Sequence, residues 1–209
     1  CEGGPNTSAE EILVGLGRAP RTTGLGVETV GLEPGAYVEV DEDMRSRAAD
    51  WLFAVGDVNG RALLTHMGKE QARIAADAIV GRDHGPVAVD GRQSPRVVFT
   101  DPQVAAVGHT LASARDAGLN VRAVDHQPGS VAGGSFVGRG ADSLARLVVD
   151  EDRRVVVGAT FVGPEVSEFV HAATIAVVAE VPLERLWHAV PAFPTRSEVW
   201  LRLLEHYGL

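Results

Sequence analysis

The sequence predicts an α+β protein in which a partial α/β segment, residues 1–85, precedes an α+β domain, residues 95–209. Short apolar runs that end at glycine or proline indicate buried strands in the first part. In the second part, several predicted strands come before several predicted helices, which is the order of elements in an α+β domain. Between the two parts, residues 84–95 are rich in glycine and proline and lack periodicity, which favours a linker.

The first part is predicted to hold three short strands and one helix. The apolar runs at residues 11–16 and 51–55 are typical of buried strands, and residues 36–40 alternate weakly, as a short strand does. Residues 65–80 carry apolar side chains at helical spacing, and Gly81 follows where a C-cap belongs.

The second part is predicted to form strands followed by helices. In residues 165–179, apolar side chains recur at i, i+3, i+4, i+7 and i+11, which makes one stripe along a helix. Strands are predicted at residues 96–99, 121–124, 144–150 and 155–162, the last two as a hairpin, and helices at 111–117, 165–179, 182–190 and after 195. The glycine-rich residues 128–140 indicate a loop or a bend in a strand.

Composition excludes several classes of function. With 19 Lys+Arg and 28 Asp+Glu the net charge is −9, so the chain has no net attraction for the phosphate backbone of nucleic acid. No apolar run is long enough to cross a membrane. A lone cysteine, Cys1, forms neither an internal disulfide nor a CxxC site, and no two of the seven histidines have ligand spacing on one helix. We therefore expect a cytoplasmic protein without a metal site, a nucleic-acid partner or a membrane partner.

Two neighbouring segments could bind a ligand. Gly56 and Asp57 directly follow a predicted buried strand, where ligands bind in open α/β sheets, although an aspartate at that place is also common in turns. Thr65 is predicted to be the N-cap of the next helix, with His66 in the first turn. The N-terminus of that helix offers free N–H groups to an anion.

The C-terminal segment offers a second set of candidates. Thr195 and Glu198 have the spacing of a capping box before the last helix. His188 is a candidate acid/base if it faces a cleft, whereas a helix-surface histidine is the more common case. Near the N-terminus, Gly15-Leu-Gly17 lacks the third glycine of a dinucleotide fingerprint, and no complete GxGxxG occurs in the chain.

Four motifs occur in order: ILVGLGRAP at residues 12–20, LFAVGD and RALLTH at 52–57 and 61–66, VFTDP with VG at 98–102 and 107–108, and FPTRSE at 193–198. Together they resemble the C-terminal half of the FAD-dependent pyridine nucleotide-disulfide oxidoreductases, a family that includes dihydrolipoamide dehydrogenase, glutathione reductase and mercuric reductase. The resemblance implies a partial FAD/NAD(P)-binding segment followed by an interface (dimerisation) domain with an antiparallel sheet and helices. It also implies that the chain, which starts at Cys1, is a piece of a longer protein.

The resemblance assigns roles to individual residues. Gly56 and Asp57 would bind the ribityl chain of FAD, and Gly17 would lie beside the nicotinamide nucleotide. The segment from Leu63 and Leu64 to Thr65 and His66 would pass the flavin, with backbone N–H groups near its O2 edge. A two-fold homodimer would place one subunit's C-terminal motif in the other's active site.

The chain departs from the family pattern at Phe193, where the family has its catalytic histidine, while Glu198 keeps the place of the glutamate partner. Phenylalanine cannot transfer a proton, although mercuric reductases also lack histidine there, and His188 is the available substitute. The resemblance thus implies part of an NAD(P)H oxidoreductase for a disulfide or another small acceptor, inactive alone. Its redox cysteine pair would lie upstream, so Cys1 is not a remnant of it. The alternative is a non-enzymatic α+β dimerisation module.

Overall fold

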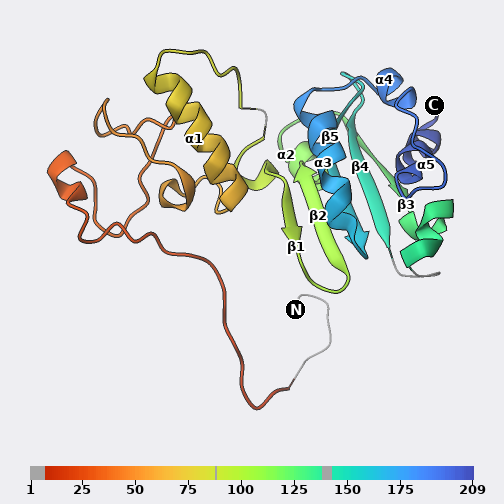
Figure 1. Cartoon of the computed structure of the whole chain (residues 1–209), viewed down its shortest axis with the longest axis horizontal. Helices are drawn as coiled ribbons and strands as arrows, with labels where there is room; N and C mark the ends of the chain where they lie inside the picture. The colour runs from red at the N-terminus through yellow and green to blue at the C-terminus, as the bar shows by residue number, and fades with distance from the viewer. Residues whose placement is uncertain (1–7, 88, 138–142) are drawn as a thin grey trace.

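The computed structural model describes residues 8–87, 89–137 and 143–209. A loop-rich first part surrounds one long helix, and a five-stranded sheet with its helices forms the second part (Figure 1). The α-helices and strands are α1 (Thr65–Ile79), β1 (Arg96–Val98), β2 (Gln103–Gly108), α2 (Leu111–Asp116), β3 (Val121–His126), β4 (Leu144–Asp150), β5 (Val155–Gly163), α3 (Val170–Val178), α4 (Leu183–Trp187) and α5 (Glu198–Tyr207).

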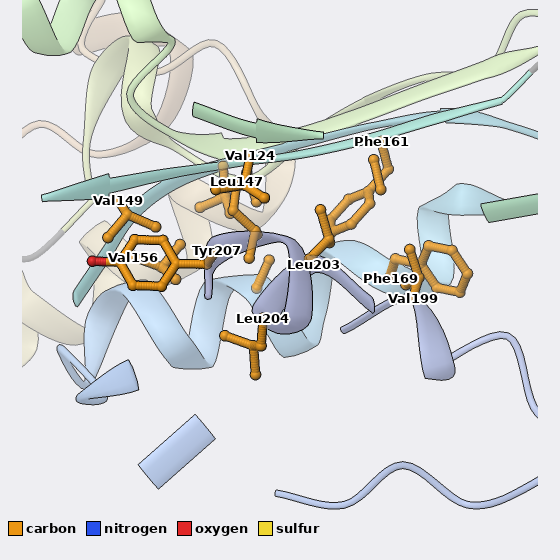
Figure 2. Packing of buried hydrophobic residues seen from close by; sticks show 14 of the residues in the cluster. Val124, Leu147, Val149, Val156, Phe161, Phe169, Val199, Leu203, Leu204 and Tyr207 are labelled. Atoms are coloured by element: carbon orange, nitrogen blue, oxygen red, sulfur yellow. The ribbon is translucent and has the colours of Figure 1, made fainter. Parts of the chain in front are cut away.

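The sheet is antiparallel throughout, with strand order β1-β2-β5-β4-β3. Its long β4–β5 hairpin carries most of the core, because alternate side chains of both strands are buried on the side that α3 and α5 cover. Figure 2 shows Leu203 and Tyr207 of α5 on the side of the helix that faces the apolar side chains of the sheet, with Val199 beside Phe169. The opposite face is covered by α2, whose Ala114 packs in a second cluster with Val148, Val155 and Val157.

The α+β architecture predicted for the second part is confirmed. The hairpin, the strands at 96–99 and 121–124, and the helix at 111–117 all form within one or two residues of their predicted bounds. The prediction omitted β2, which is a central strand. The long helix predicted at 165–179 divides into a 3₁₀ turn, Val166–Phe169, and α3, while α4 is shorter than predicted and α5 begins at Glu198.

The strands predicted in the first part were wrong. Residues 11–16 are extended without strand pairing, and the side chains of Ile12 and Leu13 are 85% and 99% exposed. Residues 36–40 and 51–55 contribute only the isolated bridges Val40–Ser46 and Arg45–Phe53. An apolar run becomes a strand only beside a partner that takes up its hydrogen bonds, and the described part of the chain supplies no neighbouring strand for these runs.

The helix predicted at 65–80 is confirmed as α1, and Gly81 ends it as expected, but its N-terminus differs from expectation. The N-cap is Leu64 rather than Thr65, and no side chain caps the first turn. At the other end Val80 is the C-cap and Gly81, with φ of 71°, follows it. The N–H groups of Gly81 and Arg82 bond to the carbonyls of Ala78 and Asp77, which is the Schellman arrangement.

Apart from a 3₁₀ turn at Gly91–Gln93, the described residues between α1 and β1 form no helix or strand. This connection is fixed to the first part by Arg61, whose guanidinium contacts the carboxylate of Asp90 at 2.6 Å.

In the glycine-rich segment the structure has two 3₁₀ turns, Pro128–Ser130 and Ala132–Val137. The remainder of that segment, residues 138–140, and Cys1 lie outside the described residues.

Within the described ranges, none of the helices combines the length and apolarity that a membrane span requires.

Candidate functional site

The turn that carries Asp57 is held in place by α1. Gly56 begins a 3₁₀ turn, Gly56–Asn59, and has φ of 80°, a conformation that favours glycine. A Cβ on Gly68 would lie 3.1 Å from the Cα of Gly56, so the turn and the helix cross at close backbone contact. The two glycines therefore allow α1 to begin directly against the turn.

A buried amide network fixes the same turn. The side chain of Gln71 is 2% exposed, and its Oε1 accepts hydrogen bonds from the N–H of Gly56 at 2.7 Å and from Nδ2 of Asn59 at 2.9 Å. Asn59 also donates to the carbonyl of Ala54 at 3.0 Å. These bonds satisfy polar groups that would otherwise be buried unpaired, so they define the backbone path that leads to Asp57.

Asp57 itself points outward. Its side chain is 49% exposed and lies 3.4 Å from Nε of Arg18, which also donates to the carbonyl of Leu63 at 3.2 Å. Arg18 thus brings the GRAP motif, the Asp57 carboxylate and the segment before α1 together. Gly17, exposed with φ of 72°, immediately precedes this arginine.

The N-terminus of α1 opens on a surface hollow. Leu63 and Leu64 are partly buried, Thr65 and His66 are exposed, and the first turn contains no acidic residue. The Nε2 of His66 lies 2.6 Å from the carbonyl of Pro95, to which it donates, so this histidine ties α1 to the start of β1. The hollow has a volume of about 540 Å³ and is lined by Arg18, Leu63, Leu64, Thr65, His66, Pro95, Arg96, Val97, Phe99, Val170, His171 and Thr174.

The C-terminal candidates lie apart from that hollow, since none of the described residues lining it comes from the FPTRSE motif.

The predicted capping box is wrong. Thr195 donates its hydroxyl to the carbonyl of Ala192 at 2.7 Å, and Ser197 is the N-cap of α5, so Glu198 is the first helical residue instead of the third. Glu198 is 6% exposed, and its Oε2 has no hydrogen-bond partner in the described part of the chain. A buried acceptor without a donor is costly, which singles out this carboxylate.

His188 and Phe193 do not complete the Glu198 site. His188 is exposed and is the C-cap of α4, and the side chain of Phe193 is 76% exposed. The motif is anchored instead by Arg196, which donates to the carbonyl of Pro164 and places its guanidinium carbon 4.7 Å from the centre of the Phe169 ring. Burial lowers the pKa of the Arg196 guanidinium.

Sequence reasoning missed three residues that shape the first site: Arg18, Asn59 and Gln71. Arg18 stood within the GRAP motif, but nothing local connects it with a carboxylate 39 positions later. Gln71 was not identified because it is a polar residue on the apolar face of the helix, where it interrupts the apolar periodicity and carries no motif of its own. Its position on that face was the available signal, since a buried amide oxygen needs donors, which here are Gly56 and Asn59. The Nε2 of Gln71 has no partner in the described part of the chain.

Comparison with known proteins agrees with this architecture. The family described as "Pyridine nucleotide-disulphide oxidoreductase, dimerisation domain" matches residues 94–203, and "Pyridine nucleotide-disulphide oxidoreductase" matches residues 2–78. The dihydrolipoyl dehydrogenase of Haloferax volcanii is 33% identical over 201 residues, and that of Geobacillus stearothermophilus is 32% identical over 199. These matches cover 95% and 94% of this chain and 41% of each relative.

Solved structures show the same correspondence. LpdA of Mycobacterium tuberculosis matches with a TM-score of 0.81 at 25% identity, over 91% of this chain and 41% of that one. The flavoprotein disulfide reductase RclA of Escherichia coli matches in fold with a TM-score of 0.76 at 23% identity, over 90% of this chain and 44% of that one. The chain spans about two fifths of the length of these relatives. It belongs to the pyridine nucleotide-disulphide oxidoreductase family, whose dimerisation domain occupies its second half.

Proposed function

We propose that this chain is the C-terminal portion of a flavin-dependent NAD(P)H oxidoreductase whose acceptor is a disulfide or another small molecule. In this proposal residues 1–85 supply the second FAD-contact segment and residues 95–209 supply a homodimer interface. The observation that carries it is the contact of Arg18 with both Asp57 and Leu63, which presents a half-exposed carboxylate beside the uncapped N-terminus of α1.

The residues present fit a flavin nucleotide at this place. Asp57 is accessible enough to accept hydrogen bonds from ribityl hydroxyl groups, and Gly56 lets the backbone approach closely. The first-turn N–H groups of α1 lack a side-chain cap, so they can bond to an anionic edge, and the helix dipole favours negative charge there. A bound FAD would supply the hydride chemistry that links NAD(P)H to the acceptor. Gly17 would lie beside the nicotinamide nucleotide.

A homodimer is supported by the apolar surface that α3 presents. The side chains of Ile175 and Val178 are 53% and 45% exposed on a helix whose other face is in the core. Beside them lies a mostly apolar hollow of about 370 Å³, lined by Ala172, Ile175, Ala176, Val181, Leu186, Ala189, Pro191, Ser197 and Trp200. A second copy of the chain would cover this surface, as the dimerisation-domain match suggests. We place such a dimer in the cytoplasm, without a nucleic-acid or membrane partner.

The acceptor side of the proposed reaction rests on Glu198 and His188. Glu198 supplies a buried carboxylate that needs a donor. His188, which is exposed at the end of α4, is the group that we propose to move a proton in place of Phe193. We propose that the chain alone is inactive, because the contacts that it offers to either nucleotide are partial.

The test is flavin retention by the complete protein. Asp57→Ala should lower the FAD content measured by absorbance after purification, because the ribityl hydroxyls lose a charged acceptor. Asp116→Ala, which removes an exposed aspartate on α2, is the matched control and should keep the FAD content of the parent protein. Equal FAD content in the two variants would count against the assignment.

The second candidate, a non-enzymatic dimerisation module, is favoured by the complete sheet of the second part and its exposed apolar face. Purification of the 209-residue chain in the presence of FAD separates the two. A colourless dimer by light scattering supports the module as the role of the isolated chain, whereas bound flavin supports a retained cofactor site.

A further inference from the structure

The structure brings two histidines together on the side of the sheet domain where β3 and α5 end. His126 is the last residue of β3 and His206 lies in the last turn of α5, 80 positions later in the sequence. Their ring centroids are 4.9 Å apart, with the ring planes at 67°. A sequence search for histidines spaced along one helix cannot find this pair, because the two residues come from different elements.

The hydrogen bonds around His206 fix its tautomer. Its Nδ1 lies 2.9 Å from the backbone carbonyl of Asp125, and a carbonyl oxygen can only accept. Nδ1 therefore carries the proton, which leaves the lone pair on Nε2. A ring nitrogen that donates to a backbone carbonyl while the other keeps its lone pair is the usual state of a histidine metal ligand.

His126 has a hydroxyl as its partner, since the oxygen of Ser130 lies 3.0 Å from its Nε2. The same hydroxyl lies 2.8 Å from the carbonyl of Gln127 and donates to it. In this arrangement the Ser130 oxygen accepts from Nε2, which leaves the lone pair of His126 on Nδ1. Each imidazole thus keeps one nitrogen able to bind a cation. The Asp125 carbonyl of β3 orients His206, and the Ser130 hydroxyl orients His126.

The neighbouring carboxylates are engaged elsewhere. Asp125 forms a bidentate pair with Arg146, with both N–O distances at 2.6 Å, and Glu205 pairs with Arg202 at 2.8 Å. In the described ranges no group of three or more His, Cys, Asp and Glu side chains is arranged to hold a metal ion. A hollow of about 400 Å³ at the pair leaves room for an ion and its water ligands, and it is lined by Asp125, His126, Gln127, Ser130, Leu144 and His206.

We propose that His126 and His206 form a surface site for a late first-row divalent cation of the Cu²⁺ or Zn²⁺ type, bound by two imidazoles and completed by water. Imidazole suits these ions, whereas Mg²⁺ and Ca²⁺ require oxygen ligands that the pair does not offer. Among divalent ions Cu²⁺ binds such nitrogen ligands most strongly. The acidic chain, with a net charge of −9, also attracts cations in general.

The test is titration of the chain with Cu²⁺, followed by calorimetry and by electron paramagnetic resonance, which reports nitrogen ligands. All proteins carry Cys1→Ser, because a thiolate would bind the same ions. The parent should bind one Cu²⁺ with coupling to two nitrogens, and Zn²⁺ should compete for it. His206→Ala and His126→Ala should each weaken binding by more than about tenfold, since even the loss of an outer-shell partner costs 10–100-fold.

His171→Ala is the matched control, since it removes an exposed histidine of α3 outside the pair and should leave the affinity unchanged. Circular dichroism checks that each variant is folded, and the exposed position of His206 keeps the test valid if the half-buried His126 position does not tolerate alanine. Unchanged Cu²⁺ affinity in folded His206→Ala protein would overturn the proposal. So would the absence of nitrogen coupling in the parent, or a loss in His206→Ala that folded His126→Ala does not share.

Discussion

The side-chain oxygen of Gln71 accepts a 2.7 Å hydrogen bond from the backbone N–H of Gly56, so the middle of α1 holds the turn that presents Asp57. Gln71→Ala would leave that N–H and the Nδ2 of Asn59 without this acceptor. We expect a loss of about 2–6 kcal/mol in the free energy of unfolding, measured with urea, from one buried and one half-buried donor at 1–3 kcal/mol each. Gln71→Glu should also destabilise the fold, because it places a carboxylate at a position that is 2% exposed. A loss well below about 1 kcal/mol in Gln71→Ala would show that the hydrogen bond is unimportant.

Asp150 should make the stability of the sheet domain dependent on pH. Burial raises the pKa of its carboxyl, but bonds from the Arg153 guanidinium and from the backbone N–H groups of Asp152 and Arg153 outweigh burial and hold the pKa below its ordinary value. A lowered folded-state pKa stabilises the fold above the unfolded pKa, about 3.9, and the gain disappears as the pH falls through the folded-state pKa.

Asp150→Asn should therefore cost about 2 kcal/mol near neutral pH, the scale of a hydrogen bond to a charged group. The difference from the parent protein should shrink as the pH is lowered below about 4. Asp116→Asn, at an exposed position, should show little difference at any pH. A constant difference between Asp150→Asn and the parent would contradict the role of the charge.

The apolar face of α3 gives a direct test of the proposed dimer. Ile175→Glu and Val178→Glu place charges on side chains that are already half exposed, so the fold should persist while association is lost. Light scattering should show monomers. Val80→Glu, at a 63% exposed residue at the end of α1, is the control and should leave the dimer intact.

Truncation after Pro191 is a poor substitute for these variants. It would remove Val199 and Leu203, both fully buried, and with them part of the core under the sheet. The expected result is unfolding or aggregation rather than a folded monomer. A soluble dimer after truncation would contradict the packing of α5.

Gly158 in β5 allows the chain after β2 to pass close to the sheet. A Cβ at this position would overlap the carbonyl oxygen of His109, whose N–H donates to the carbonyl of Val157 at 2.9 Å. Gly158→Ala should therefore destabilise the domain by about 1–3 kcal/mol, the usual cost of overpacking. Gly15→Ala, with nothing within 4 Å of the added methyl group, should have the melting temperature of the parent protein. Equal melting temperatures in the two variants would contradict the close contact.

The sequence predicted best those elements that are specified by their own residues. The β4–β5 hairpin has two mostly apolar runs around a polar turn, and α1 has a helical stripe that ends at Gly81. β2 was missed because Ala105, Ala106 and Gly108 give little strand signal, although the strand is central.

The candidate site was predictable only in part, because its contacts join segments that are distant in the sequence. The position of Asp57 after an apolar run pointed to it, but its contact with Arg18 joins distant segments. The spacing of Thr195 and Glu198 suggested a cap, whereas the structure buries the carboxylate. Spacing specifies which residues share a turn of helix, and it does not specify which of them faces the core.

The extended residues 11–16 have a consequence for handling the protein. Ile12, Leu13, Val14 and Leu16 are between 66% and 99% exposed on a backbone without strand pairing. Each buried methylene is worth about 0.8 kcal/mol, so any sheet edge that accepts this segment gains both apolar burial and hydrogen bonds. Copies of the chain can offer that edge to one another, which makes this segment the place where concentration would first limit solubility.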